Sequence, residues 1–144
     1  MNAVGIDVSK GKSTVAILRP GGEVVASPFE VSHNPRKLNE LVTLIKSLNG
    51  DSKILMEYTG NYYLPVALFL QKSGLFVSVV NPILVKDYNN KSLYVRKGKT
   101  DKKDYLKLAA FALYRWHELP LFSPHSASRT LLKAFNRQYN QYIK

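Results

Sequence analysis

The stretch Lys99-Thr100-Asp101-Lys102-Lys103-Asp104 opens a helical pattern that we expect to run to Trp116. Residues three apart share one face of a helix, so Asp101 and Asp104 should point the same way as the apolar face, into the domain. The same two acids also fit a capping-box-like helix start, which would make them purely structural. The apolar residues follow at helical spacing: Tyr105, Leu108, Ala109, Ala112, Leu113 and Trp116.

Positive charge dominates the composition. The 144 residues include 21 Lys and Arg against 10 Asp and Glu, a formal net charge of +11. Such a surplus favours a polyanionic partner, most simply nucleic acid, although a basic domain without such a partner is the alternative. Because acids are scarce, the positions at which they occur are informative.

The composition also excludes several classes of protein. There is no cysteine, which rules out disulfides and thiolate metal sites. No apolar run reaches the roughly 18 residues that a membrane span needs. The N-terminus enters a strand-like pattern directly, so we expect neither a signal peptide nor a membrane segment.

A third acid, Asp7, lies in a strand-like pattern over residues 1–9. Side chains alternate along a strand, so Val4, Ile6 and Val8 share one face and Asp7 points to the other. Burying a carboxylate among apolar residues is costly unless something positive meets it. Asp7 is therefore a candidate site residue, and a solvent-facing Asp near a strand end is the alternative.

A fourth acid, Glu57, ends a short strand-like segment over residues 53–58, before the turn Thr59-Gly60. Open α/β sheets bind their ligands at the carboxyl ends of strands. Glu57 is therefore also a candidate site residue, and an exposed charge at the end of a strand is the alternative.

The order of elements is β-β-β-α-β-α-β-α-α, in which short links make the first three strands an antiparallel meander. One sheet with helices packed on it can bring the four acids together. Strands are expected over residues 1–9, 13–18, 23–31, 53–58 and 76–80, and helices over 34–48, 61–73, a short segment from 83, and 101–116.

Four clustered carboxylates would repel one another unless cations neutralise them. Two divalent metal ions about 3.5–4 Å apart do this, and they can clamp the attacking and leaving oxygens of a phosphoryl transfer. Oxygen ligands favour Mg²⁺ or Mn²⁺ over zinc. The candidate metal ligands are Asp7, Glu57, Asp101 and Asp104.

Basic residues between 91 and 103 are expected to form a loop that orders on a phosphate backbone, with a solvated connector as the alternative. Two further lysines lie between the first two strands. The candidate nucleic-acid contacts are Lys10, Lys12, Lys91, Arg96, Lys97, Lys99, Lys102 and Lys103.

The segment Val4-Gly5-Ile6-Asp7-Val8-Ser9-Lys10 resembles the first motif of the Asp-Glu-Asp-Asp insertion-sequence transposases, relatives of the Piv/MooV DNA invertases. Met56-Glu57-Tyr58-Thr59-Gly60 resembles the second motif, and Asn81-Pro82 and Lys99–Asp104 resemble the rest. The resemblance covers about residues 3–116. It implies an RNase H-like (RuvC-like) mixed sheet with helices on both faces, and metal binding by the four acids. Tyr105 departs from the small residue more often found there, which affects the expected local packing.

The resemblance also implies a domain organisation. Residues 1–117 would be the catalytic domain, 118–128 a linker, and 129–144 the truncated start of a coiled-coil dimerisation helix. The family's C-terminal serine domain would be absent, so we expect little or no activity from this chain alone. Implied partners of the full-length protein are DNA, a structured guide RNA and further copies of itself, with no membrane. The implied location is the prokaryotic cytoplasm, associated with the nucleoid.

The expected function is therefore that of a transposase or recombinase domain that cleaves and exchanges DNA strands with Mg²⁺ or Mn²⁺. A nuclease of the Holliday-junction resolvase kind has the same fold and acids and remains open. So does a nucleic-acid-binding module with an inactive acid cluster. A sugar or acetate kinase is suggested by Gly5-Ile6-Asp7-Val8-Ser9, but no second Gly-rich phosphate motif is present.

Overall fold

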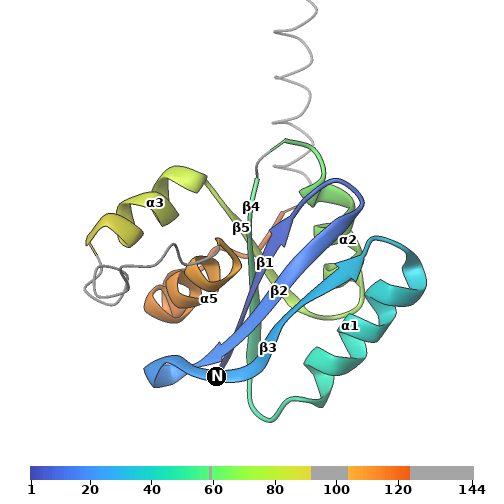
Figure 1. The fold of residues 1–144 in the computed structure, drawn as a ribbon, viewed down its shortest axis with the longest axis horizontal. Helices are drawn as coiled ribbons and strands as arrows, with labels where there is room; N and C mark the ends of the chain where they lie inside the picture. Colours follow the sequence, from blue (N-terminus) through green and yellow to red (C-terminus); the bar gives the residue numbers. More distant parts are fainter. Residues whose placement is uncertain (59, 92–103, 124–144) are drawn as a thin grey trace, which may run out of the picture.

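The computed structural model describes residues 1–58, 60–91 and 104–123 (Figure 1). The described strands form one five-stranded mixed sheet in the order β3-β2-β1-β4-β5. The first three strands are an antiparallel meander, as the sequence predicts, and β1, β4 and β5 run parallel. The strands are β1 (Asn2–Val8), β2 (Lys12–Arg19), β3 (Glu23–Ser32), β4 (Ser52–Glu57) and β5 (Phe76–Val80).

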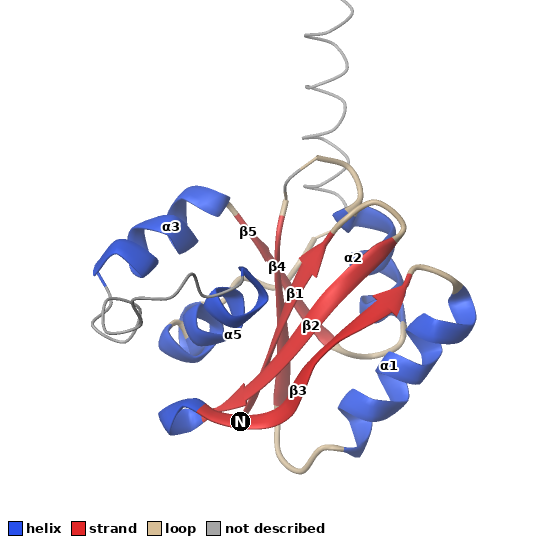
Figure 2. Ribbon diagram, viewed as in Figure 1, coloured by secondary structure: helices blue, strands red, loops and turns tan. Residues whose placement is uncertain are grey.

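Helices cover both faces of the sheet (Figure 2). Helices α1 and α2 pack on one face, and α5 and α3 on the other. No helix in the described part of the chain is both long and apolar enough to cross a membrane. The helices are α1 (Pro35–Ser47), α2 (Tyr63–Lys72), α3 (Pro82–Lys91) and α5 (Asp104–Tyr114), with 3-10 turns at η1 (Pro20–Gly22) and η2 (Trp116–Glu118).

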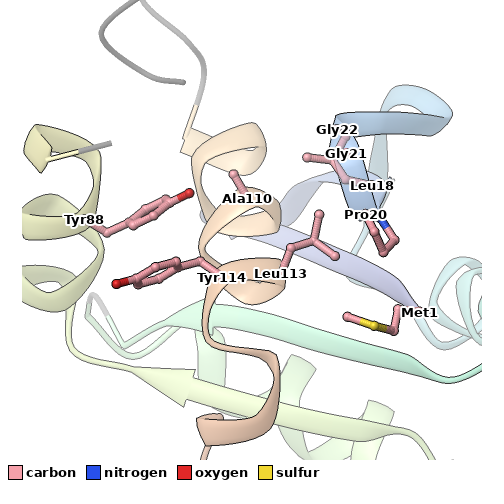
Figure 3. Close-up of a pocket in the computed structure, with 9 residues that line it drawn as sticks. All are labelled: Met1, Leu18, Pro20, Gly21, Gly22, Tyr88, Ala110, Leu113 and Tyr114. Atoms are coloured by element: carbon pink, nitrogen blue, oxygen red, sulfur yellow. The ribbon is translucent and has the colours of Figure 1, made fainter. Parts of the chain in front are cut away.

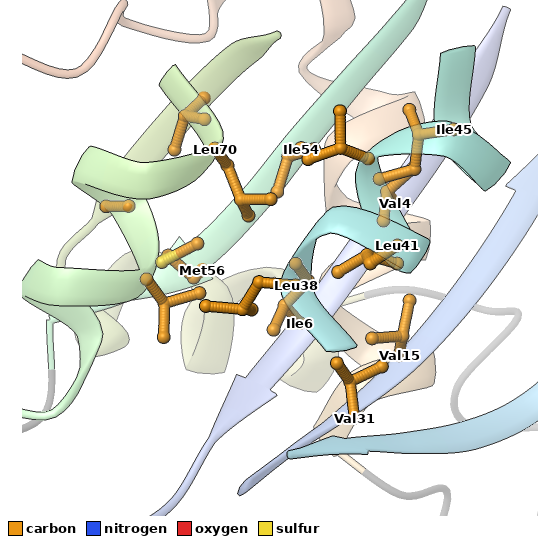
Figure 4. Close-up of a cluster of buried hydrophobic side chains, with 14 of the residues drawn as sticks. Val4, Ile6, Val15, Val31, Leu38, Leu41, Ile45, Ile54, Met56 and Leu70 are labelled. Atoms are coloured by element: carbon orange, nitrogen blue, oxygen red, sulfur yellow. The ribbon is translucent and has the colours of Figure 1, made fainter. Parts of the chain in front are cut away.

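The larger hydrophobic core lies between the sheet and α1 and α2 (Figure 4). Val4 and Ile6 point into it, which confirms the predicted alternation along β1. Each such buried aliphatic side chain contributes about 1.5–3 kcal/mol relative to an exposed one. The stripe predicted for the first helix is also buried: Leu38, Leu41, Val42 and Ile45.

Helix α1 begins where the sequence predicts. The Asn34 side chain accepts a hydrogen bond from the Lys37 backbone N–H at 2.8 Å, and Pro35 occupies the first helical position. This cap satisfies one of the amides that have no partner at a helix start. The cap thereby fixes the start of the helix that covers the larger core.

On the other face, α5 lies directly on β1, because Gly5 has no side chain. A Cβ on Gly5 would lie 2.5 Å from the Ala109 amide nitrogen and 3.0 Å from the Leu108 Cβ. Leu108 and Ala109 are fully buried, as predicted for this helix. Phe111 is also buried, although it was not part of the predicted stripe.

The segment that follows α5 packs against both faces of the sheet. Leu119 joins the core under α5, and Phe122 joins the core under α1 and α2. The Phe122 N–H donates to the Val77 carbonyl at 2.8 Å, and Gln71 Nε2 donates to the Phe122 carbonyl at 2.7 Å. The described first part of the predicted linker is thus attached to the domain, whereas residues 124–144, with the predicted coiled-coil start, lie outside the described residues.

Candidate functional site

Asp7 and Glu57 occupy equivalent positions on two neighbouring parallel strands. Gly5 of β1 pairs with Leu55 of β4, and the two acids lie two residues further along their strands. Strand side chains repeat every second residue, so both acids follow the face on which α5 packs. The two candidate ligands from distant parts of the sequence therefore meet at one edge of the sheet, and both are half-buried.

Helix α5 brings its first residue, Asp104, toward the same edge. The turn η2 that follows the helix is held at the start of β4, where Lys53 Nζ donates to the Trp116 carbonyl at 2.7 Å. The first turns of α5 lie on Gly5 of β1, which is close to the Tyr105 carbonyl and the Ala109 amide. The helix thus runs antiparallel to β1, so the backbone at Asp104 lies near the carboxyl ends of β1 and β4.

The fourth predicted ligand, Asp101, lies outside the described residues, and the side chain of Asp104 is not described either. Within the described part of the chain, no three acidic, histidine or cysteine side chains are grouped closely enough to hold a metal ion. The donor chemistry of Asp7 and Glu57 nevertheless suits a hard divalent cation, because carboxylate oxygens are the ligands that Mg²⁺ and Mn²⁺ prefer.

Two of the predicted nucleic-acid contacts flank this edge. Lys10 and Lys12 lie in and just after the hairpin that follows β1, and both are exposed. Lys12 Nζ is 3.5 Å from a Glu30 carboxylate oxygen, an exposed ion pair that contributes little to stability. Lys91 ends α3. The other five predicted contacts lie outside the described residues: Arg96, Lys97, Lys99, Lys102 and Lys103.

Thr14 is a neighbour of the acids that the sequence analysis did not identify. It is paired with Asp7 across the β1–β2 ladder, so both side chains follow the same face of the sheet. Thr14 is half-buried, and its hydroxyl adds a hydrogen-bonding group on the face that carries the carboxylate. The register of the predicted hairpin was the signal that could have identified it.

A partly buried hydrogen bond supports the hairpin between β1 and β2. Ser13 Oγ and His33 Nε2 are 2.6 Å apart, and the backbone N–H of His33 donates to the Gly11 carbonyl at 3.0 Å. Burial lowers the pKa of His33 below its ordinary value of 6.5. The His33 backbone therefore holds the end of β3 at the turn that carries Lys10, and the imidazole is bonded to Ser13 on β2.

Two tyrosines mark the end of β4. The Tyr58 N–H donates to the Val80 carbonyl at 3.2 Å, which continues the strand pairing past Glu57. The Tyr58 ring centroid lies 6.3 Å from that of Tyr63 on α2. Burial raises the pKa of Tyr63, and the neighbouring Tyr58 phenol adds to the rise. These contacts fix the backbone on which Glu57 is carried.

Comparison with known proteins identifies the fold. Residues 4–144 match the family model DEDD_Tnp_IS110, described as a transposase. The structure of T. thermophilus RuvC in complex with Holliday junction substrate has 12% identity and a TM-score of 0.58, with 81% of this chain and 95% of that chain covered. A second Thermus thermophilus RuvC structure has 13% identity and a TM-score of 0.55, with coverage of 84% and 100%. No curated protein matched the sequence. The predicted RuvC-like fold is thus confirmed.

Proposed function

We propose, because this chain belongs to the DEDD_Tnp_IS110 transposase family, that it is the catalytic domain of an enzyme that cleaves and exchanges DNA strands. The proposal rests on one observation: the carboxyl ends of β1 and β4 lie next to each other in the sheet. The register between Gly5 and Leu55 aligns Asp7 with Glu57, and α5 begins near the same edge. Ligands of open α/β sheets bind at such carboxyl ends.

The proposed metal ligands are Asp7, Glu57, Asp101 and Asp104, with Mg²⁺ or Mn²⁺ as the ion. A pair of such ions, when bound, stabilises the attacking and leaving oxygens of a phosphoryl transfer. Asp7 and Glu57 serve this role from hydrogen-bonded strands, which hold a ligand more rigidly than a loop does. The two strands thus preorganise half of the ligand set.

The proposed contacts to the DNA backbone are basic. Lys10 and Lys12 would hold phosphates beside the acids, because exposed ammonium groups exchange their counterions for phosphate. The basic residues between 91 and 103 would extend this contact. For the full-length protein we propose a structured guide RNA, a homo-oligomer, a downstream serine domain and a cytoplasmic location, all on the basis of the family.

Isothermal titration of Mg²⁺ and Mn²⁺ into the chain tests the metal site. We expect Asp7→Asn to weaken metal affinity at least about tenfold, a loss of about 1.4 kcal/mol, and to leave the circular dichroism spectrum unchanged. Asp51→Asn is the matched control, because Asp51 is an exposed acid that precedes the opposite end of β4. Equal metal affinities for Asp7→Asn and the unmodified chain would refute the proposed metal site. The chain would then be interpreted as a nucleic-acid-binding module.

A junction-resolving nuclease is a second candidate, favoured by the similarity to RuvC bound to a Holliday junction. It would have the same fold and the same acids. The reading frame downstream of Lys144 separates the two candidates. A following domain that supplies a serine nucleophile supports the transposase, and a stop codon supports the resolvase.

A further inference from the structure

Two tyrosines stack against each other on the α3 and α5 side of the molecule (Figure 3). The ring centroids of Tyr88 and Tyr114 are 4.7 Å apart, and the ring planes are inclined by 26°. Phe111 also contacts Tyr88 in an edge-to-face arrangement, at a centroid distance of 5.6 Å. Tyr114 is nonetheless 64% exposed, so a large aromatic surface is fixed in place and open to solvent.

A groove of about 500 Å³ extends from this pair across α5 to the turn at η1. Figure 3 shows Ala110 and Leu113 on α5 between the tyrosines and the glycines of the turn. The lining is apolar, and no carboxylate side chain lines its described part. Met1 lines the groove and precedes β1, so the groove lies at the opposite end of that strand from Asp7.

Two basic residues, Lys107 and Arg115, lie on the same part of the chain as Tyr114. The Arg115 guanidinium lies 5.8 Å from the centre of the Tyr114 ring and forms an exposed ion pair with Glu118. Lys107 lies on the same helical stripe as Tyr114, seven residues earlier. In the sequence, α3 and α5 are also the two helices that flank the basic run of residues 91–103, which carries six Lys and Arg. An exposed aromatic ring with basic residues nearby suits a polyanion whose own rings are exposed and can stack on it.

We propose that Tyr88, Tyr114 and the adjoining groove, together called the tyrosine platform, bind unpaired DNA. One base would stack on the exposed part of the Tyr114 ring and displace the Arg115 guanidinium that lies over it, and Arg115 would exchange Glu118 for a phosphate. Proteins that bind single strands combine aromatic stacking with basic side chains that contact the phosphates, and Tyr114, Arg115 and Lys107 would supply these groups here. The proposal rests on the proposed function, which makes DNA the polymer, because strand cleavage and exchange expose unpaired strands. Duplex DNA buries its base faces and would gain nothing from the stack.

Fluorescence anisotropy with a labelled thymidine oligomer tests the platform, in EDTA so that metal plays no part. We expect Tyr114→Leu to weaken binding about tenfold, as expected for the loss of one stacked base. Tyr114→Trp should retain binding, because it keeps an aromatic face. Leu44→Ala on α1, at an exposed position of the opposite face, is the control and should change nothing.

Three results would overturn the platform: full binding by Tyr114→Leu, an equal loss for a duplex of the same length, or a loss confined to a uridine RNA oligomer. Metal titration of Tyr114→Leu separates this proposal from the metal site. We expect unchanged Mg²⁺ affinity, since the groove lies at the other end of β1. An unmodified chain that bound no metal would refute the proposed function and leave the anisotropy result standing.

Discussion

Gly5 of β1 and Ala109 of α5 are in such close contact that a Cβ on Gly5 would lie 2.5 Å from the Ala109 amide nitrogen. A backbone amide cannot yield as the tip of a side chain can, so Gly5→Ala must displace the helix. We expect a cost of about 1–3 kcal/mol in the free energy of unfolding, as for other overpacked cores. Because α5 also carries Asp104, metal affinity should fall as well. Urea denaturation and metal titration measure the two effects.

Gly11→Ala is the comparison for this variant. Nothing lies within 4 Å of a Cβ at Gly11, but its φ of 78° is unfavourable for alanine. This variant should lose stability through backbone strain alone and keep its metal affinity. If Gly5→Ala also kept its metal affinity, the position of α5 would not matter for the site.

Local signals allowed much of the fold to be predicted from the sequence. Asn34 and Pro35 mark a helix start because their chemistry acts within one turn, and the apolar run over residues 76–80 is a strand of the expected bounds. The meander followed from short links between strands. The RuvC-like arrangement of the parallel strands came from the family resemblance, since strand order depends on contacts that no local pattern contains.

Long-range packing limited the rest of the prediction. Leu119 and Phe122 lie among prolines and serines, a composition typical of a linker, yet both are buried. Their burial depends on cavities that exist only once the sheet and helices are assembled. The contact between Gly5 and α5 was missed for the same reason. Asp7 and Glu57 were predicted as candidate ligands because scarce acids in apolar strands are conspicuous even without a fold.

Metal should stabilise the folded chain through the acids. A ligand that binds only the folded state raises the free energy of unfolding, by about 2.7 kcal/mol at a concentration one hundred times its dissociation constant. We therefore expect Mg²⁺ to raise the melting temperature and EDTA to reverse the rise. Glu57→Gln should remove most of this effect without unfolding the domain. Scanning calorimetry measures it, and an equal rise in Glu57→Gln would exclude Glu57 as a ligand.

Binding of duplex DNA should depend steeply on salt. Each phosphate neutralised by a lysine or arginine adds about 0.9 to the slope of log K against log salt concentration. Replacing Lys97 and Lys99 together by glutamine should therefore reduce the slope by up to about 1.8. Lys46→Gln, in the last turn of α1 on the face of the sheet away from α5, should leave the slope unchanged. If log K for the unmodified chain did not change with salt concentration, residues 91–103 would not contact the DNA phosphates.

Acidification should weaken the support of the hairpin by His33. Burial lowers the pKa of His33 in the folded chain, so the unfolded chain takes up the proton first as the pH falls. The contribution of the neutral imidazole to stability is therefore complete above the ordinary pKa of 6.5 and is lost as the pH falls from there through the lowered value. We expect the stability of the chain relative to His33→Gln to decrease between about pH 7.5 and about pH 5.5.

Urea denaturation at several pH values, with both proteins in the same buffers, measures this difference in the free energy of unfolding. Ser13→Ala is a second test of the role of His33, because it removes the hydroxyl that lies 2.6 Å from His33 Nε2 and leaves the imidazole in place. This variant should be less stable at every pH and should keep the downward trend, since burial and not the hydroxyl lowers the pKa. A stability difference between the chain and His33→Gln that grew on acidification would mean that the fold favours the protonated ring, and that the hairpin next to Asp7 is held by a charge.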